Sequence, residues 1–180
     1  MRVIGGRLRS RLLKSVPGNA VRPTPDRLRE ALFNVLAPRI EGAVFLDAYA
    51  GTGAVGVEAI SRGASRVIFI ESNRRAITVL RENLAALDVV AEHATIVQGK
   101  AAAQVARYTC DIAFLDPPYE AVDDYTATLR ALGTAACPLV IAQHASRFAL
   151  DERYAALKKT RVLKQGDNSL TFFERDSTGE

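Results

Sequence analysis

Apolar residues recur along this chain at two spacings, which predict strands alternating with helices. From residue 43 onward, short apolar runs are separated by segments whose apolar residues recur at helical spacing. This alternation is typical of βα units that build a mostly parallel sheet with helices on both faces. The expected strands are Val44 to Asp47, Val67 to Glu71, Thr95 to Gln98, Ile112 to Asp116 and Leu139 to Gln143.

The two ends of the chain follow other patterns. The first 20 residues carry β-like apolar patches broken at Gly5-Gly6, which predicts a short basic hairpin or an extended arm. Near the carboxyl end, Lys159 to Lys164 and Ser169 to Glu174 flank the turn sequence Gly166-Asp167-Asn168. This arrangement predicts an antiparallel hairpin that closes the sheet.

A helix is expected between the arm and the first strand. Thr24 stands where an N-cap is expected and Pro25 at the first helical position, two residue types favoured at helix starts. Apolar residues follow at helical spacing, namely Leu28, Leu32, Val35 and Leu36. The helix should end near Pro38, because a proline in a helix lacks the N–H donor and clashes with the preceding turn.

The length of 180 residues fits a single domain, since hydrophobic cores rarely divide below about 250 residues. We expect an arm over residues 1–22 and one domain over residues 23–180. Neither Cys110 nor Cys137 belongs to a CxxC pair, so the sequence gives no support for a metal site or a disulfide framework. No apolar run is long enough to span a membrane and no signal peptide is visible, so a cytoplasmic protein is expected.

Positive charge is concentrated at the amino-terminal end. Residues 1–30 hold eight Arg or Lys side chains against two acidic ones, whereas the other residues hold 16 basic and 18 acidic side chains. A basic arm on a near-neutral body favours a polyanionic partner. Solubilising surface charge explains the same asymmetry equally well.

A glycine-rich loop follows the first expected strand. Gly51, Gly53 and Gly56 have the GxGxxG spacing at the start of a predicted helix, where glycine allows a tight turn and a close ligand approach. Glu71 ends the second strand 20 residues after Gly51, where a carboxylate can accept hydrogen bonds from ribose hydroxyls. The combination indicates a cofactor that contains adenosine.

Two cofactor classes fit this loop, a dinucleotide and S-adenosylmethionine. Asp47, four residues before Gly51, would repel a pyrophosphate but attract the ammonium and sulfonium groups of S-adenosylmethionine. Asp47 therefore favours S-adenosylmethionine, while a role confined to capping the loop stays open. No metal is required, because the sulfonium is already a good leaving group.

The tetrapeptide Asp116-Pro117-Pro118-Tyr119 follows the fourth expected strand. Ligands of open parallel sheets bind beyond the carboxyl ends of the strands, so this motif and the glycine loop are expected to face one crevice from adjacent strands. The prolines withhold N–H donors, which leaves the carboxylate and carbonyl oxygens as acceptors for an NH2 group. Tyr119 offers a flat face on which a base can stack. The motif thus predicts methyl transfer to the exocyclic amino group of a base, accelerated mainly by alignment.

The tetrapeptide is similar to the (D/N/S)PP(Y/F/W) motif of class I S-adenosylmethionine-dependent methyltransferases that modify amino groups. Further segments resemble the bacterial 16S ribosomal RNA guanine-N2 methyltransferase family, over nearly the whole chain to Phe173-Glu174. The matching segments are Arg2 to Gly6, Arg22 to Thr24, Asp26 to Glu30, Leu32 to Asn34 and Leu46 to Ala54, with Gly56, Glu58 and Ala59.

The resemblance implies a Rossmann-like, doubly wound α/β fold, with a mostly parallel seven-stranded sheet, a C-terminal antiparallel hairpin and the small basic arm. It also implies a monomer that methylates N2 of one guanine in 16S rRNA, acts on assembling small ribosomal subunits and releases S-adenosylhomocysteine. The residues carried over as catalytic are Asp116, Pro117, Pro118 and Tyr119. Those carried over to the cofactor site are Asp47, Tyr49, Gly51, Thr52, Gly53, Glu71, Ser72, Gly99 and Lys100.

An rRNA partner gives the arm a physical role, because phosphate contacts are needed and make binding salt dependent. The candidate phosphate-binding residues are Arg7, Arg9, Arg11, Lys14 and Arg22. The target guanine must leave its stack to reach a crevice at the strand ends, so base flipping or a single-stranded site is expected.

Three other functions stay open. A DNA adenine-N6 methyltransferase uses the same tetrapeptide, but this chain leaves no room for a target-recognition domain. A dinucleotide-binding oxidoreductase fits the glycine loop, but His93 and His144 lie outside the motifs and are expected to be structural. A non-catalytic RNA-binding module is the third alternative, and the intact Asp116 to Tyr119 motif argues against it.

Overall fold

The computed structural model describes residues 1–18, 24–118 and 120–177. Its eight-stranded sheet has the order β3-β2-β1-β4-β5-β8-β7-β6. The five parallel strands are β1 (Val44–Asp47), β2 (Arg66–Glu71), β3 (Ala94–Gln98), β4 (Ile112–Leu115) and β5 (Leu139–Ala145). The antiparallel strands that extend the sheet beyond β5 are β8 (Asn168–Arg175), β7 (Leu157–Gln165) and β6 (Arg153–Tyr154).

The doubly wound α/β fold with its C-terminal antiparallel hairpin is confirmed. The expected strands lie where their apolar runs predicted them, to within two residues at each end. The sheet has one strand more than the seven expected, because β6 consists of only two residues and is too short to give an alternating pattern.

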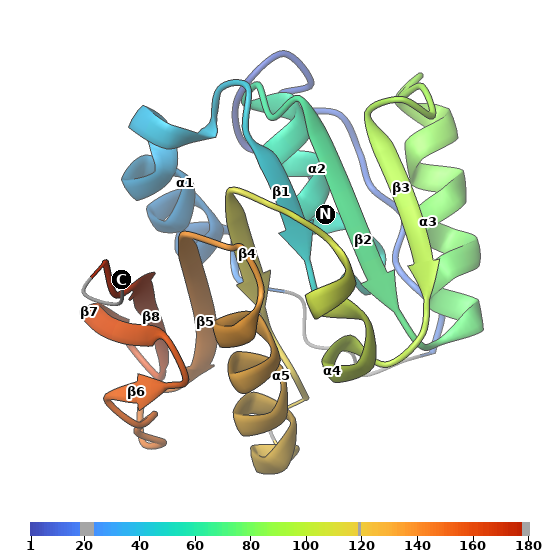
Figure 1. Ribbon diagram of the computed structural model, residues 1–180. Helices are drawn as coiled ribbons and strands as arrows, with labels where there is room; N and C mark the ends of the chain where they lie inside the picture. The colour runs from blue at the N-terminus through green and yellow to red at the C-terminus, as the bar shows by residue number, and fades with distance from the viewer. Residues whose placement is uncertain (19–23, 119, 178–180) are drawn as a thin grey trace.

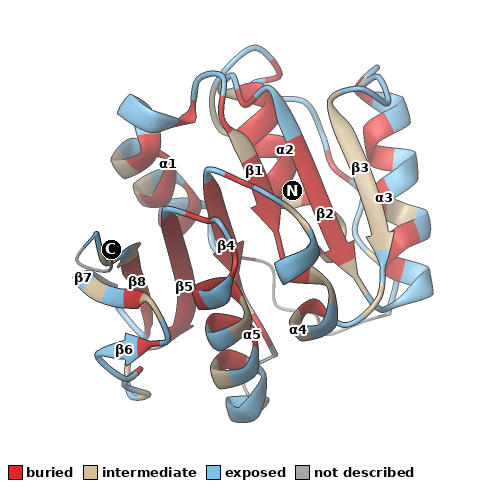
Figure 2. Ribbon diagram, viewed as in Figure 1, coloured by how far each residue is buried: buried red, intermediate tan, exposed pale blue. Residues whose placement is uncertain are grey.

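Alternate residues of the strands face two helical layers. Phe45 and Phe69 pack in one core cluster with the layer of α1 (Asp26–Ile40), α2 (Ala54–Ser61) and α3 (Arg74–Ala86). Leu46 and Ile68 face the opposite layer of α4 (Ala101–Gln104), η1 (Val105–Arg107) and α5 (Val122–Thr134). Figure 1 shows α4 and α5 on the near side of the sheet, and Figure 2 shows the central strands as its most buried part.

Helix α1 begins and ends at other residues than expected. It starts at Asp26, so Pro25 takes the N-cap position, and no side chain caps the helix. The Thr24 hydroxyl, expected as the cap, instead donates to Oδ2 of Asp116 at 3.4 Å. The helix also continues through Pro38 to Ile40, and burial of the Ile40 side chain favours this last turn despite the missing proline donor.

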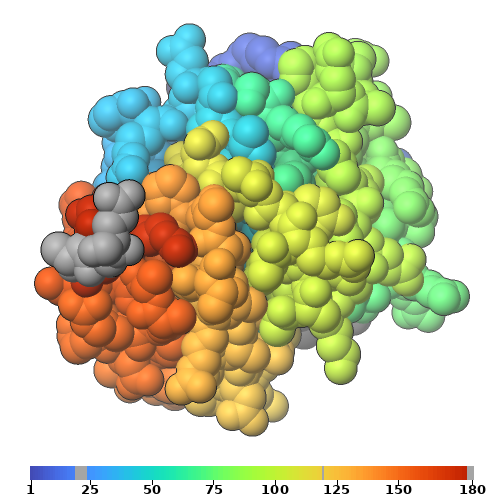
Figure 3. Space-filling model, viewed as in Figure 1, coloured from blue at the N-terminus to red at the C-terminus, as the bar shows by residue number. Residues whose placement is uncertain are grey.

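The amino-terminal arm forms a hairpin, one of its two expected conformations. Arg2 pairs antiparallel with Leu12, and the Val3 and Leu8 side chains are buried in the cluster that holds α1 and α2. The arm therefore packs on the helical layer behind the sheet, and in the space-filling view it shows only at the upper edge (Figure 3). The boundary expected at residue 22 lies outside the described residues.

Candidate active site

A cavity of about 740 Å³ lies at the carboxyl ends of the central strands. Because β1 and β4 are neighbours in the sheet, the glycine loop and the segment that starts at Asp116 face this one cavity, as expected. The sequence-predicted residues that line it are Asp47, Tyr49, Gly51, Thr52, Glu71, Ser72, Gly99, Lys100, Asp116, Pro117 and Pro118. Tyr119 and Arg22 lie outside the described residues.

The three glycine positions of the loop favour glycine for different structural reasons. Gly51 has a φ of +56°, and open space surrounds the position of a Cβ atom there. A Cβ on Gly53 would stand 2.3 Å from Leu80 of α3, and one on Gly56 would stand 2.2 Å from the Phe69 ring. Gly51 therefore leaves room beside the cavity, whereas Gly53, expected at the cofactor, is buried and lets the helices pack closely.

Asp47 is almost fully buried at the end of β1. Its Oδ2 accepts the N–H of Gly56 at 3.0 Å, so the carboxylate caps the first turn of α2 while also lining the cavity. Burial raises the pKa of Asp47 to about 7, and the charge of Glu71 adds to the shift. The capping role that the sequence left open is thus present together with a place at the cavity wall.

Glu71 holds the loops after β1 and β2 together. Its Oε2 accepts the Gly51 N–H at 2.7 Å, while Oε1 accepts the N–H groups of Ser72 and Asn73 at 2.8 Å each. Three of about four acceptor positions of the carboxylate are therefore engaged by backbone donors. Glu71 shapes the wall of the cavity and keeps the glycine loop in its observed conformation.

Asp116 follows the last residue of β4 and faces the cavity beside the start of α1. Burial, followed by the charge of Asp47, raises the pKa of Asp116 to about 7, and the hydrogen bond from Thr24 opposes this shift. Together with Asp47 and Glu71, it gives the cavity an acidic wall. Such a wall fits a ligand that carries positive charge.

The Tyr49 side chain is tied to the opposite helical layer. Its hydroxyl lies 2.7 Å from Oγ1 of Thr128 in α5, and burial raises the pKa of Tyr49 to about 12. The phenol therefore stays protonated at neutral pH. Its position fixes the distance between the glycine loop and α5 on one side of the cavity.

The two histidines have structural partners, as expected. The Nδ1 atom of His93 lies 2.8 Å from the Ser65 carbonyl, and Nε2 of buried His144 lies 2.6 Å from Oγ1 of Thr171. Burial lowers the pKa of His144. Among the residues that the structure describes, no three His, Cys, Asp or Glu side chains gather at a metal-binding distance, and no helix has the length and apolarity needed to cross a membrane.

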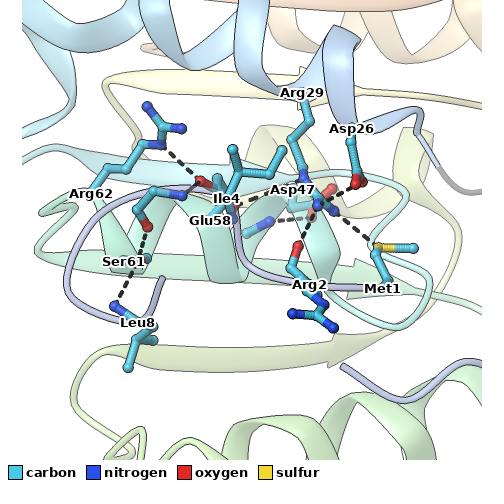
Figure 4. A network of polar contacts seen from close by, with 12 residues as sticks. Met1, Arg2, Ile4, Leu8, Asp26, Arg29, Asp47, Glu58, Ser61 and Arg62 are labelled. Carbon is cyan, nitrogen blue, oxygen red and sulfur yellow. Dashed lines mark hydrogen bonds and ion pairs between the residues drawn. The ribbon is translucent and has the colours of Figure 1, made fainter. Parts of the chain in front are cut away.

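A buried ionic network, which sequence reasoning missed, attaches the arm to α1 and α2 (Figure 4). Glu58 accepts the backbone N–H groups of Ile4 and Gly5 at 2.8 Å each and the Arg62 Nε–H at 2.8 Å. Fully buried Arg29 contacts Glu58 at 3.9 Å. The available signal was a single carboxylate within the apolar run around Val57 to Ile60.

Asn83 of α3 joins the arm to the glycine loop. It is buried, and its Nδ2 donates to the carbonyl of Lys14 at 3.1 Å and to the carbonyl of Thr52 at 3.0 Å. Its Oδ1 accepts the Lys14 N–H at 2.8 Å. The arm thereby continues into the cavity, where Ser15 and Val16 form part of the wall.

The candidate phosphate-binding side chains that the structure describes divide into two groups. The Arg11 guanidinium donates to the Ala86 carbonyl at 2.6 Å, and the Lys14 ammonium pairs with Glu82 at 2.9 Å. Arg7 and Arg9 are exposed, and no ion pair within the described residues engages them. These two are the candidate phosphate-binding residues most available to an external anion.

Comparisons with known proteins match between about two thirds of the chain and nearly all of it. The model of the family described as conserved hypothetical protein 95 matches residues 1–174. The chain is 32% identical over 189 residues to the Bacillus subtilis (strain 168) protein "Putative rRNA methyltransferase YlbH", covering 97% of this chain and 99% of that protein. It is 43% identical over 121 residues to "Ribosomal RNA small subunit methyltransferase D" of Escherichia coli (strain K12), covering 66% of this chain and 60% of that protein. The solved structure "Putative methyltransferase yhhF from Escherichia coli" matches with a TM-score of 0.83 at 33% identity, covering 99% of both chains.

Proposed function

We propose, since the chain belongs to the conserved hypothetical protein 95 family, that it transfers a methyl group from S-adenosylmethionine to N2 of one guanine in 16S ribosomal RNA. The observation that carries this proposal is the shared cavity, in which the glycine loop after β1 meets Asp116 and Pro117 after β4. The relatives named as rRNA methyltransferases support the substrate class.

The cavity fits S-adenosylmethionine by the chemistry of its wall and by the open space at Gly51. We assign Asp47 to the ammonium group of the cofactor, Glu71 to the ribose hydroxyls, and the backbone of Gly99 and Lys100 to the adenine. Tyr49, Thr52 and Ser72 complete this wall. When bound, S-adenosylmethionine supplies an electrophilic methyl group with a neutral thioether as leaving group.

Asp116 and the Pro117 carbonyl are assigned to the target amino group. An exocyclic purine nitrogen is a poor nucleophile, because its lone pair is delocalised into the ring. Acceptors that hold both N–H bonds favour a pyramidal nitrogen and fix the direction of its lone pair. Asp116, whose pKa is about 7, stabilises the positive charge that develops on the amine and can take up its proton. Pro118 stiffens the segment, and Tyr119 is assigned to stacking on the base.

The RNA is assigned to the arm. Arg7, Arg9, Arg11, Lys14 and Arg22 would contact phosphates, with Arg7 and Arg9 needing to break no described ion pair or side-chain hydrogen bond. We further propose that residues 1–22 act as the RNA-binding arm of a monomeric cytoplasmic enzyme, residues 23–180 being the methyltransferase domain, and that its substrate is an assembling small subunit.

The direct test is transfer from methyl-labelled S-adenosylmethionine to small ribosomal subunits that lack the modification, followed by nucleoside analysis. We expect labelled N2-methylguanosine from the unaltered protein and none from Asp116→Ala. The exposed residue Asp123 of α5 supplies a matched control, because Asp123→Ala should keep full activity.

Other products would identify the alternatives. Label in N6-methyladenosine, or transfer to duplex DNA but not to the subunit, would replace the proposal with a DNA adenine methyltransferase. Thermal stabilisation by NAD, with none by S-adenosylhomocysteine, would indicate an oxidoreductase. Binding of RNA without any transfer would leave a non-catalytic module.

A further inference from the structure

Gln143 has a buried side-chain oxygen at the cavity wall, and this acceptor has no hydrogen-bond partner within the described residues. The residue belongs to β5, is 3% exposed and lines the cavity. Its Oε1 atom is buried and accepts no hydrogen bond within the part of the chain that the structure describes. Buried side-chain acceptors nearly always have a partner, so an unpaired one at a cavity wall points to a bound molecule.

The position of Gln143 in the sheet places it beside Asp116. Strands β4 and β5 are parallel neighbours, and Leu115 is paired with Ala142, so Asp116 and Gln143 each follow a paired residue. Side chains alternate along strands, and Phe114 and Ile141 belong to the core on the side of α1 and α2. Asp116 follows Phe114 by two positions, and Gln143 follows Ile141 by two positions. Both side chains are therefore directed to that same side of the sheet, from strands about 4.8 Å apart.

The chemistry of guanine matches this pair of residues. Along its Watson–Crick edge, the N2 amino group is followed by the N1–H donor and then by the O6 acceptor. We propose that Gln143 reads this edge while Asp116 holds N2, with Oε1 accepting from N1–H and Nε2 donating to O6. Enzymes that act on flipped bases commonly read them in this way. The inference rests on the proposed function, and it adds Gln143 as a residue that determines base specificity.

The location of Gln143 favours the base over the cofactor. The residues assigned to the cofactor follow β1, β2 and β3, whereas β5 lies beyond β4 on the opposite side of Asp116. An adenine with N6 at Asp116 would present the N1 lone pair to Oε1 in place of a donor. The amide would then have to rotate, and the O6 partner would be missing.

The test compares two target bases with variants of Gln143. Subunits are reconstituted with 16S rRNA that carries either guanine or 2-aminopurine at the methylated position, since 2-aminopurine keeps the amino group but lacks N1–H and O6. For the unaltered protein we expect a higher kcat/KM on guanine. Gln143→Met should lower kcat/KM on guanine by about tenfold to a hundredfold and reduce the preference over 2-aminopurine by a similar factor. Gln143→Glu keeps the acceptor for N1–H but loses the donor to O6, so it should retain more of the preference than Gln143→Met.

Gln165 supplies a matched control. Its Oε1 is also buried and unpaired within the described residues, but it lies at the end of β7, outside the cavity lining. Gln165→Met should leave the preference for guanine unchanged. If Gln143→Met does not fold, as judged by thermal unfolding, Gln143→Leu replaces it.

The outcomes separate the inference from the proposed function. An unaltered preference for guanine in Gln143→Met would overturn the assignment of Gln143 and leave the proposed function intact. A loss of affinity for S-adenosylhomocysteine in the same variant would also overturn it, because the amide would then belong to the cofactor site. If the unaltered protein methylates no guanine in the subunits, the proposed function and this inference both fall.

Discussion

Asp116 and Asp47 line one cavity from neighbouring strands, and the charge of Asp47 opposes the ionisation of Asp116. Burial, followed by the charge of Asp47, raises the pKa of Asp116 to about 7, and burial raises that of Asp47 to about 7. Without a cationic ligand, both groups are thus partly protonated at neutral pH. The acidic wall that fits the cofactor is therefore also a source of instability in the ligand-free protein.

Asp116→Asn should stabilise the ligand-free protein in alkaline solution. The unfolded chain ionises Asp116 near pH 4 and the folded chain near pH 7, so the folded state loses stability as the pH rises between these values. We expect a melting temperature a few degrees above that of the unaltered protein at pH 8 and no difference at pH 3.5. Differential scanning calorimetry measures both. The control Asp123→Asn, in the exposed first turn of α5, should not raise the melting temperature at either pH.

The affinity for S-adenosylhomocysteine should rise with pH through the pKa of Asp47. Ionised Asp47 attracts the ligand's ammonium group, whereas protonated Asp47 does not, so the affinity should increase about tenfold from pH 6 to pH 8. Asp47→Asn keeps an oxygen for the Gly56 N–H and should bind more weakly at pH 8 with a flatter profile. Isothermal titration calorimetry gives both curves, and equal slopes would remove Asp47 from ammonium recognition.

Arg7 and Arg9 should account for part of the salt dependence of subunit binding. Each phosphate contact contributes close to one unit to the slope of log affinity against log salt, so the double replacement by Ala should reduce this slope by about 1.5. Arg107 and Arg130, exposed on the opposite helical layer, supply the control pair. A slope that changes equally in both double variants would assign the arm charges to solubility alone.

Glu58→Ala should destabilise the fold and release the arm. The substitution removes the acceptor of the Ile4 and Gly5 N–H groups and takes away the buried carboxylate beside Arg29, which keeps only the exposed Asp26 carboxylate at 3.1 Å. Breaking a buried ion pair typically lowers the free energy of unfolding by about 3–5 kcal/mol. Urea denaturation measures this change, and limited trypsin digestion should cut the arm sooner.

Glu82→Ala is the comparison for Glu58→Ala. Glu82 pairs with Lys14 on the surface, where the loss of an ion pair costs at most about 1 kcal/mol. If both variants lose the same free energy of unfolding, the buried network does not hold the arm.

The sequence predicted those parts of the site that depend on neighbours along the chain. Asp47, Glu71 and Asp116 each stand at the end of an apolar run, and in a parallel sheet strand ends meet at one edge. Gly51 and Gly53 were found through their spacing, although Gly53 serves packing against Leu80. Local pattern was sufficient here, because the fold brings strand ends together whatever their loops contain.

Residues whose roles depend on distant contacts could not be found in this way. Thr24 has the local signature of a helix cap, yet its hydroxyl lies at Asp116, 92 positions away. Asn83 and Gln143 stand within ordinary helical and strand patterns, and only the packed structure shows that one joins Lys14 to Thr52 and the other faces the cavity. The roles of their polar atoms depend on residues that are distant in the sequence, and hydrophobic periodicity does not predict these contacts.

Helix α2 separates the arm from the methylation site by a fixed length. The glycine loop leads into its first turn, whereas its last residue, Ser61, accepts the backbone N–H of Arg7. Its eight residues span about 12 Å, and the hairpin cannot slide along them while Glu58 is paired. Under the proposed function, the helix therefore sets the distance between the arm and the methylation site. The enzyme would then contact one extruded base and, at a defined distance from it, the phosphates bound by the arm. It would therefore recognise the folded shape of the RNA and not merely a short nucleotide sequence.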